Sequence, residues 1–139
     1  MIDLIGRYGT ERFHVCADAL LNQAERLARN AIRAMPDGTY AFEDFIDDDG
    51  IDPGAIPIRV TITVAGDKLT ADFTGTAPQV RGAINSPLPF TKSAVYACVR
   101  HLIGGDPPNN EGYFRPIEVI APAARSSTRS CPPRSRRAA

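Results

Sequence analysis

The chain has 139 residues, which suits one domain of modest size, and 43% of them are hydrophobic, which is enough for a core. Its formal net charge is zero, but five of the 16 basic residues lie beyond Ala121 and none of the 16 acidic residues does, so the preceding part carries −5. That balance gives no reason to expect a protein that binds nucleic acid. No run approaches the ~18 apolar residues of a membrane span, and no signal-peptide pattern is visible, so a cytoplasmic protein is expected.

Residues 10–35 predict one amphipathic helix, because apolar side chains recur there at three- and four-residue spacing. Thr10 is the expected N-cap through its hydroxyl, and Pro36 ends the helix because proline cannot extend the hydrogen-bond ladder. The short apolar segment before Gly9 is interpreted as the end of an earlier helix. The expected buried stripe consists of Phe13, Cys16, Ala17, Leu20, Ala24, Leu27, Ala28, Ala31 and Met35.

Residues 39–74 predict a three-stranded antiparallel meander. The first strand is rich in aromatic residues, and residues 56–64 and 69–73 alternate apolar with polar side chains, which is the period of a strand with one buried face. The turn 65–68 joins the last two strands. The first helix is the expected cover for the apolar face, so the sequence predicts an α+β fold.

A second helix is predicted at residues 91–103, with Val95, Cys98, Val99 and Leu102 as its buried stripe. A short strand is predicted at 117–120. Residues 122–139 consist mainly of Arg, Ser, Pro and Ala without an apolar pattern, so they are expected to form a disordered basic tail.

The connection from Ala71 to Pro87 combines glycines, prolines, one arginine and one asparagine, a composition typical of loops that carry sites. Arg81 and Asn85 can bind an anion or a carbonyl group, since arginine offers a fork of donors. The alternative is that Arg81 pairs with a surface carboxylate and Asn85 stabilises a turn. No GK[ST] or GxGxxG motif makes this connection a phosphate loop.

Thr91, Lys92 and Ser93 open the second predicted helix, where they either approach an anion or cap the helix. The acidic segment 47–49, followed by Gly50, does not satisfy an EF-hand loop. An acidic hairpin loop in water is the preferred interpretation, and a weak divalent-ion contact that includes Asp52 is the alternative.

Histidine and cysteine residues give no site. His14 and His101 are expected to be ordinary helix residues, because neither has a metal-ligand partner at i+4. Cys16 and Cys98 are expected to be buried free thiols, and Cys131 lies in the tail. No catalytic triad and no metal site can be argued from the residues alone.

The sequence resembles the hydantoinase B/oxoprolinase family over nearly all of residues 1–122. The segments that carry the resemblance are DFTGT at 72–76, PQVRGAIN at 78–85, PL at 87–88, TKSAVY at 91–96 and GYFRPIEVIAP at 112–122, with PDGTY at 36–40 and DDDG at 47–50. The resemblance implies that residues 1–121 are an interior part of a much larger protein. It also carries the family's loop onto Arg81, Gly82 and Asn85 as candidate substrate-pocket residues.

The resemblance further implies a function. Family members work with an A-type subunit that holds ATP with Mg²⁺, and they open a stable cyclic amide through phosphorylation of its carbonyl oxygen. The family's metal-binding region has no counterpart in this chain, so no metal ligand is carried over and no cofactor is assigned to it. Acetone and acetophenone carboxylases are related members, which leaves part of a carboxylase as an alternative. The other alternative is that the chain is a non-catalytic structural remnant.

Three further expectations follow from the resemblance. The chain alone is expected to be inactive, and its apolar surface is expected to remain exposed where other parts of the larger protein would pack. The tail is interpreted as the product of a frameshift near residues 122–125, and a natural basic tail is the alternative. Read one base earlier with GC-rich codons, residues 125–137 can spell a leucine-rich peptide that resembles the family's continuation.

Overall fold

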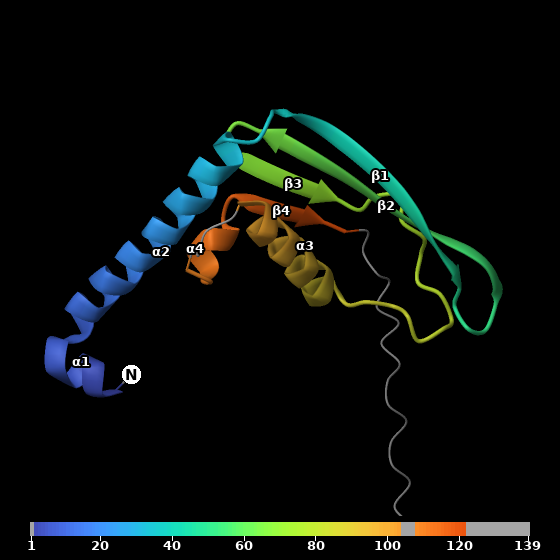
Figure 1. Ribbon diagram of the computed structural model, residues 1–139. Helices are drawn as coiled ribbons and strands as arrows, with labels where there is room; N and C mark the ends of the chain where they lie inside the picture. The colour runs from blue at the N-terminus through green and yellow to red at the C-terminus, as the bar shows by residue number, and fades with distance from the viewer. Residues whose placement is uncertain (1, 104–107, 122–139) are drawn as a thin grey trace, which may run out of the picture.

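The computed structural model describes residues 2–103 and 108–121, and the predicted tail and Cys131 lie outside them. A curved sheet arches over two helices, while a long helix runs away from one end of the sheet (Figure 1). The elements are α1 (Ile2–Tyr8), α2 (Thr10–Arg33), β1 (Gly38–Asp48), β2 (Pro53–Ala65), β3 (Lys68–Asp72), α3 (Leu88–Ile103), α4 (Glu111–Phe114) and β4 (Ile117–Ile120).

The sheet has the strand order β1-β2-β3-β4. Its first three strands pair antiparallel, in the order in which they follow one another in the chain, and β4 adds to β3 in parallel. The short strand predicted at 117–120 is therefore the fourth strand of one mixed sheet. Together with the helices, it gives the α+β fold that the sequence predicts.

Glycine sets the break between α1 and α2 and the turn between β2 and β3. Gly9 has a φ of 80° and is the N-cap of α2, which has no side-chain cap bond, so the expected capping by Thr10 is wrong. Gly66 has a φ of 60° in the turn, and its amide donates to the Asp37 carboxylate at 2.9 Å. Both positions need a backbone conformation that glycine adopts at little cost.

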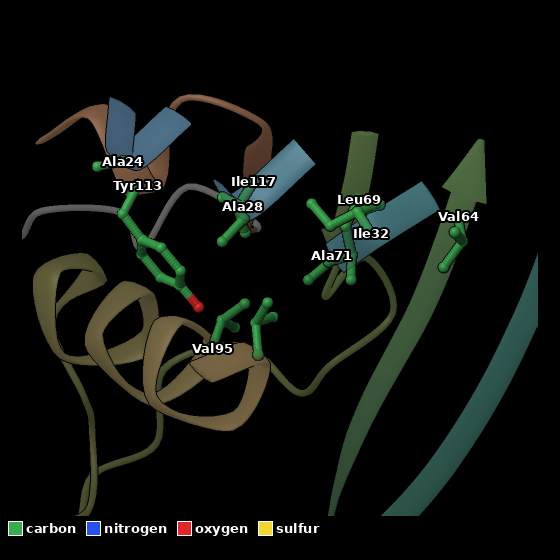
Figure 2. Close-up of a cluster of buried hydrophobic side chains, with 10 residues drawn as sticks. Ala24, Ala28, Ile32, Val64, Leu69, Ala71, Val95, Tyr113 and Ile117 are labelled. Carbon is green, nitrogen blue, oxygen red and sulfur yellow. The ribbon is translucent and has the colours of Figure 1, made fainter. Parts of the chain in front are cut away.

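The core lies where α2, α3 and α4 meet the β3–β4 end of the sheet. Figure 2 shows the Tyr113 ring between Ala24 of α2 and Val95 of α3. The buried apolar residues are Ala24, Ala28, Ile32, Val64, Leu69, Ala71, Val95, Val99, Tyr113 and Ile117. The period-two pattern thus places one face of β2 and β3 against the helices, as predicted.

The buried residues of α2 all lie in its C-terminal half, which corrects the predicted stripe. Leu20 is 56% exposed and Leu27 is 44% exposed, and Cys16 is exposed as well. Cys16 and Leu20 belong to the N-terminal half of α2, which projects beyond the sheet in Figure 1. Leu27 belongs to the C-terminal half and lies on its exposed side. The buried Ala24 and Ala28 lie four residues apart on the side that meets the other elements.

The second helix begins at Leu88, three residues before the predicted start, and it buries a narrower face than expected. Val95 and Val99 are buried, whereas Leu102 is 72% exposed and Cys98 is exposed. Neither described cysteine is therefore a buried thiol, since each lies on a helix face that no other described element covers.

Close backbone contact joins α2 to α4. Gly112 is buried, and a Cβ atom there would overlap the backbone carbonyl of Leu21. Beside this contact, the Glu25 carboxylate accepts hydrogen bonds from Arg115 at 2.8 Å and Arg29 at 2.9 Å. Hydrogen bonds from these two guanidinium groups lower the pKa of Glu25, and the bond from Arg115 has the larger effect.

Candidate functional site

The candidate site is built from two segments, the hairpin tip (residues 48–53) between β1 and β2 and the long loop (residues 73–87) between β3 and α3. The long loop first runs along β2. The Thr76 hydroxyl bonds the backbone of Arg59 in both directions, at 3.0 Å to the amide and 2.9 Å to the carbonyl, and the Ala77 amide donates to Pro57 at 2.9 Å. These bonds carry the loop from the end of β3 toward the hairpin tip.

A buried carboxylate joins the two segments. Asp49 is 6% exposed, and its Oδ1 accepts from the amides of Ile51 at 2.8 Å and Asp52 at 2.6 Å. Its Oδ2 accepts from the Gly82 amide at 2.9 Å. The acidic hairpin loop was expected to lie in water, and for Asp49 that expectation is wrong because backbone donors replace water around the carboxylate.

The same donors shift the titration of this carboxylate. Hydrogen bonds from the backbone amides, with Asp52 and Ile51 contributing most, hold the pKa of Asp49 below its ordinary value, and they outweigh burial, which acts in the opposite direction. Asp49 is therefore ionised at neutral pH, and its negative charge favours this arrangement of the loop.

Gly82 permits the close approach of the long loop to the hairpin tip. It is buried, and a Cβ atom at this position would overlap the backbone carbonyl of Asp49. Any larger residue would push the two segments apart. Gly82 thus has a structural reason to be glycine, and it is not among the residues that line the depression beside Arg81.

Asn85 holds the long loop in shape. Its Oδ1 accepts from the Val80 amide at 2.9 Å, and its Nδ2 donates to the carbonyls of Val80 at 2.7 Å and Gly82 at 2.9 Å. Both amide hydrogens are therefore used within the loop. This is the turn-stabilising role that the sequence left open as an alternative, and it leaves Asn85 no donor for a ligand.

Arg81 is the member of the predicted set that faces solvent. Its side chain is 72% exposed, and its Nη1 lies 3.1 Å from the Asp52 carboxylate, as the alternative interpretation proposed. It also lines a shallow depression of about 400 Å³ between the hairpin tip and residues 79–81. The remaining guanidinium donors can bind an anionic or carbonyl oxygen there.

The residues at the start of α3 belong elsewhere. Ser93 donates to the Pro89 carbonyl within the helix at 2.8 Å, and Lys92 lines a different depression of about 440 Å³ beside β3 and β4, together with Lys68 and Tyr96. The predicted anion contact of Thr91, Lys92 and Ser93 therefore does not join the Arg81 loop.

The described residues contain no group of three or more His, Cys, Asp or Glu side chains that could hold a metal ion. The hairpin-tip carboxylates are used within the protein, since Asp48 accepts from the Gly50 amide at 2.8 Å and Asp52 pairs with Arg81. The divalent-ion alternative therefore gains no support from the geometry. His101 bonds the carbonyl of Ala97 within α3, at 2.7 Å.

The role of Asp49 was not predicted from the sequence. The sequence groups the three aspartates as one acidic cluster, although the first residue of an Asp-Gly-containing turn often bonds backbone amides two or three residues on. That local signal was available. The contact with Gly82, 33 residues away, was not.

The sequence profile of the hydantoinase B/oxoprolinase family matches residues 1–136. The chain belongs to this family. The long loop and the hairpin tip both lie within the matched segment, so the site described above is part of the hydantoinase B sequence.

Several relatives of this chain have names that specify a subunit or a substrate. It is 38% identical over 132 residues to a protein from Pseudomonas sp. (strain NS671) named as the B-type subunit of a D-/L-hydantoinase, and that match covers 87% of this chain and 22% of the relative. It is 31% identical to the beta subunit of the caprolactamase of Pseudomonas jessenii, over 86% of this chain and 20% of the relative. It is 40% identical to 5-oxoprolinase 1 of Arabidopsis thaliana, over 61% of this chain and 6% of the relative.

A solved structure shares the fold. The crystal structure of the ATP-dependent caprolactamase from Pseudomonas jessenii matches with a TM-score of 0.75 and 29% sequence identity, covering 85% of this chain and 20% of the caprolactamase chain. This hydantoinase B chain spans about a fifth of the length of the hydantoinase and caprolactamase subunits that it matches. No helix in the described part is long and apolar enough to cross a membrane.

Proposed function

We propose that this chain forms part of the B-type subunit of an ATP-dependent cyclic-amide hydrolase. The observation that carries the proposal is the 38% identity to the B-type subunit of a hydantoinase over 132 residues. The likeness to the ATP-dependent caprolactamase, at a TM-score of 0.75, supports it. The partner would be an A-type subunit that binds ATP, and the substrate a small cyclic amide. Such an enzyme would work in the cytoplasm.

The hydrolase is preferred to the carboxylase alternative because of the relatives' names. Hydantoin, caprolactam and 5-oxoproline each contain an amide bond within a ring. Amide resonance makes the ring carbon a poor electrophile, which is why ATP would be spent on its activation. Part of a carboxylase of the same family remains the second candidate.

The proposal assigns no ATP or metal step to this chain. Its described residues offer no ligand group for a metal ion, and its sequence has no phosphate loop. The chain also spans only about a fifth of its hydantoinase relative. We therefore expect the isolated chain, with residues 1–121 as a partial domain, to be inactive. A frameshift remains our explanation for residues 122–139.

Arg81 is the residue that we assign to the substrate pocket. Of the candidates Arg81, Gly82 and Asn85, only Arg81 lines the depression and keeps donors that the loop does not use. Its guanidinium would bind a carbonyl or carboxylate oxygen of the substrate, in competition with Asp52. Gly82 and Asn85 would act on the pocket by holding the loop in place.

A chimera tests the proposed function. Residues 1–121 of this chain replace the matching segment of the B-type subunit of the Pseudomonas hydantoinase, and the product is combined with its A-type subunit. ATP-dependent ring opening is measured with a hydantoin, caprolactam and 5-oxoproline, and bicarbonate incorporation into acetone tests the carboxylase. We expect ring opening of at least one cyclic amide. Carboxylation alone would favour the second candidate.

Substitution of Arg81 in that chimera tests the residue assignment. Arg81→Gln should lower kcat/KM by about 10- to 100-fold, mainly through KM, because one charge-assisted hydrogen bond of ~1.5–3 kcal/mol is lost. Arg59→Gln is the matched control, since Arg59 is another exposed arginine that pairs with a carboxylate, Glu43, at 2.7 Å. An Arg81→Gln variant with unchanged kcat/KM would reject the pocket role and leave the hydrolase proposal standing.

A further inference from the structure

The β1–β2 ribbon, where these strands extend beyond β3, has one polar and one apolar face. The polar face carries the cross-strand pair Glu43 and Arg59, whose ion pair measures 2.7 Å. We call the other side the apolar ribbon face. It consists of Phe42, Ile46, Ile56, Ile58 and Val60, and Tyr40 continues it opposite Ile62, where β3 begins to pair with β2.

The apolar ribbon face continues the core side of the sheet. Val64 is buried in the core, and every second residue of β2 before it points to the same side, through Ile62 and Val60. The helices cover only the β3–β4 end of the sheet, as Figure 1 shows. The apolar pattern of β1 and β2 therefore continues beyond the part of the sheet that the helices cover. Phe42 is consequently 66% exposed and Ile58 is 36% exposed.

An uncovered row of aromatic and β-branched residues on a strand pair is unusual for a surface that remains in water. Scattered apolar residues need no explanation, but a contiguous patch rimmed by polar groups marks an interaction site. The alternation holds for most of this ribbon, with Phe42 opposite Val60 and Ile46 opposite Ile56, and it is broken by Asp44 on the apolar side and by Phe45 on the polar side. Such a pattern fits a strand pair with cover on one side.

We propose, on the basis of the function proposed above, that the apolar ribbon face is an intramolecular interface that packs against the remaining part of a hydantoinase B chain. The caprolactamase chain contains this same fold as 20% of its length, and the hydantoinase relative contains the matching sequence as 22% of its length. About four-fifths of each relative therefore lies outside the segment described here and is available to cover the ribbon.

Charge on the ribbon face favours this occupant over a second copy of the chain. Asp44 pairs with Ile58 in the sheet register and so lies on the same side as Phe42. An occupant that buries this face needs a basic or hydrogen-bonding group opposite Asp44. A second copy that used the same face would bury a second Asp44 carboxylate, and the residues of that face include no basic side chain.

Cysteine labelling tests the interface with the chimera, in which residues 1–121 lie within the hydantoinase chain, and with the isolated 139-residue chain. Cys16, Cys98 and Cys131 are first changed to Ser, and then Phe42→Cys or, on the opposite face, Ala41→Cys is introduced. We expect Phe42→Cys to react with a thiol reagent about 100-fold more slowly in the chimera than in the isolated chain, because it is protected by packing. Ala41→Cys should react at similar rates in both.

Four results would overturn the proposal. One is equal labelling of Phe42→Cys in the two proteins. Another is labelling of the isolated chain that slows as its concentration rises, which would identify a second copy as the occupant. A third is protection that appears only when the A-type subunit is added. The last is a chimera that is insoluble with the native ribbon, since the ribbon would then not fit its neighbours. Labelling measures burial and does not depend on turnover. Failure of the interface proposal can therefore be distinguished from failure of the hydrolase proposal.

Discussion

At the scale of single residues, the candidate site is a loop held in place by groups that bind the protein itself. Asp49 accepts three backbone amides, and Asn85 bonds the backbone on both sides of Arg81. Gly82 allows the two segments to touch. Their joint effect is to present Arg81 at the surface of the hairpin tip on a fixed backbone.

Replacement of Gly82 should disrupt this contact. Gly82→Ala places a methyl group where the Asp49 carbonyl lies, so we expect it to destabilise the chain by about 2–3 kcal/mol, as overpacking does elsewhere. Urea denaturation measures the change. Gly6→Ala is the control, because a Cβ at Gly6 in α1 has open space and alanine favours helix, so stability should be unchanged or raised by up to about 1 kcal/mol. Equal effects of the two substitutions would contradict the close contact.

The charge of Asp49 should make the stability of the loop depend on pH. Because its pKa is lowered in the folded protein, Asp49 contributes stability above its ordinary pKa, and this contribution is lost as the pH falls through the folded-state pKa. Asp49→Asn should therefore be less stable than the parent at pH 7, and the difference should shrink when both are measured by urea denaturation near pH 3.

The neighbouring Asp47→Asn is the matched control for this pH dependence. Asp47 is exposed, and none of the described residues forms a hydrogen bond with its side chain. Its substitution should leave the denaturation midpoint nearly unchanged at both pH values. If Asp49→Asn were equally harmless at pH 7, the buried carboxylate would not anchor the loop.

The residue scale also shows what the sequence could not reveal. Asp47 and Asp49 are two residues apart and chemically identical, yet only Asp49 is buried, because its position is decided by Gly82 far along the chain. Cys16 and Cys98 fit helical apolar patterns but face away from the other described elements. Local pattern identifies residue types, whereas burial depends on partners that are distant in sequence.

At the scale of elements, the periodic segments were predicted well and their extents less well. Period-two alternation located β2 and β3, and helical spacing located α2 and α3. A spacing of 3.6 residues cannot show where α2 leaves the sheet, so Leu20 was expected in the core. The four residues of β4 are too few to reveal their parallel partner.

The two halves of α2 should respond differently to the same substitution. Ile32 is fully buried, so Ile32→Ala should cost about 2–5 kcal/mol through lost burial and a cavity. Leu20 is 56% exposed, so Leu20→Ala should cost less than about 1 kcal/mol. Both are measured by urea denaturation of the isolated chain. Similar costs would mean that the N-terminal half of α2 is also packed in solution.

At the scale of the whole molecule, the chain belongs to the hydantoinase B/oxoprolinase family and matches about a fifth of the length of the hydantoinase and caprolactamase subunits. Resemblance at the motifs around residues 72–85 identified the family, which the profile match over residues 1–136 confirms. The residues alone name no reaction, because the described part holds no group of three or more side chains that could bind a metal ion and the sequence offers no argument for a catalytic triad.

The most direct test of the proposed function is ATP-dependent ring opening of a hydantoin, measured side by side for the parental hydantoinase complex, the chimeric complex and the isolated 139-residue chain. We predict turnover by the chimeric complex within about tenfold of the parental rate, strict dependence on ATP, and no turnover by the isolated chain. A chimeric complex that is folded and assembled yet inactive on every cyclic amide, or an isolated chain that opens the ring by itself, would contradict the proposal.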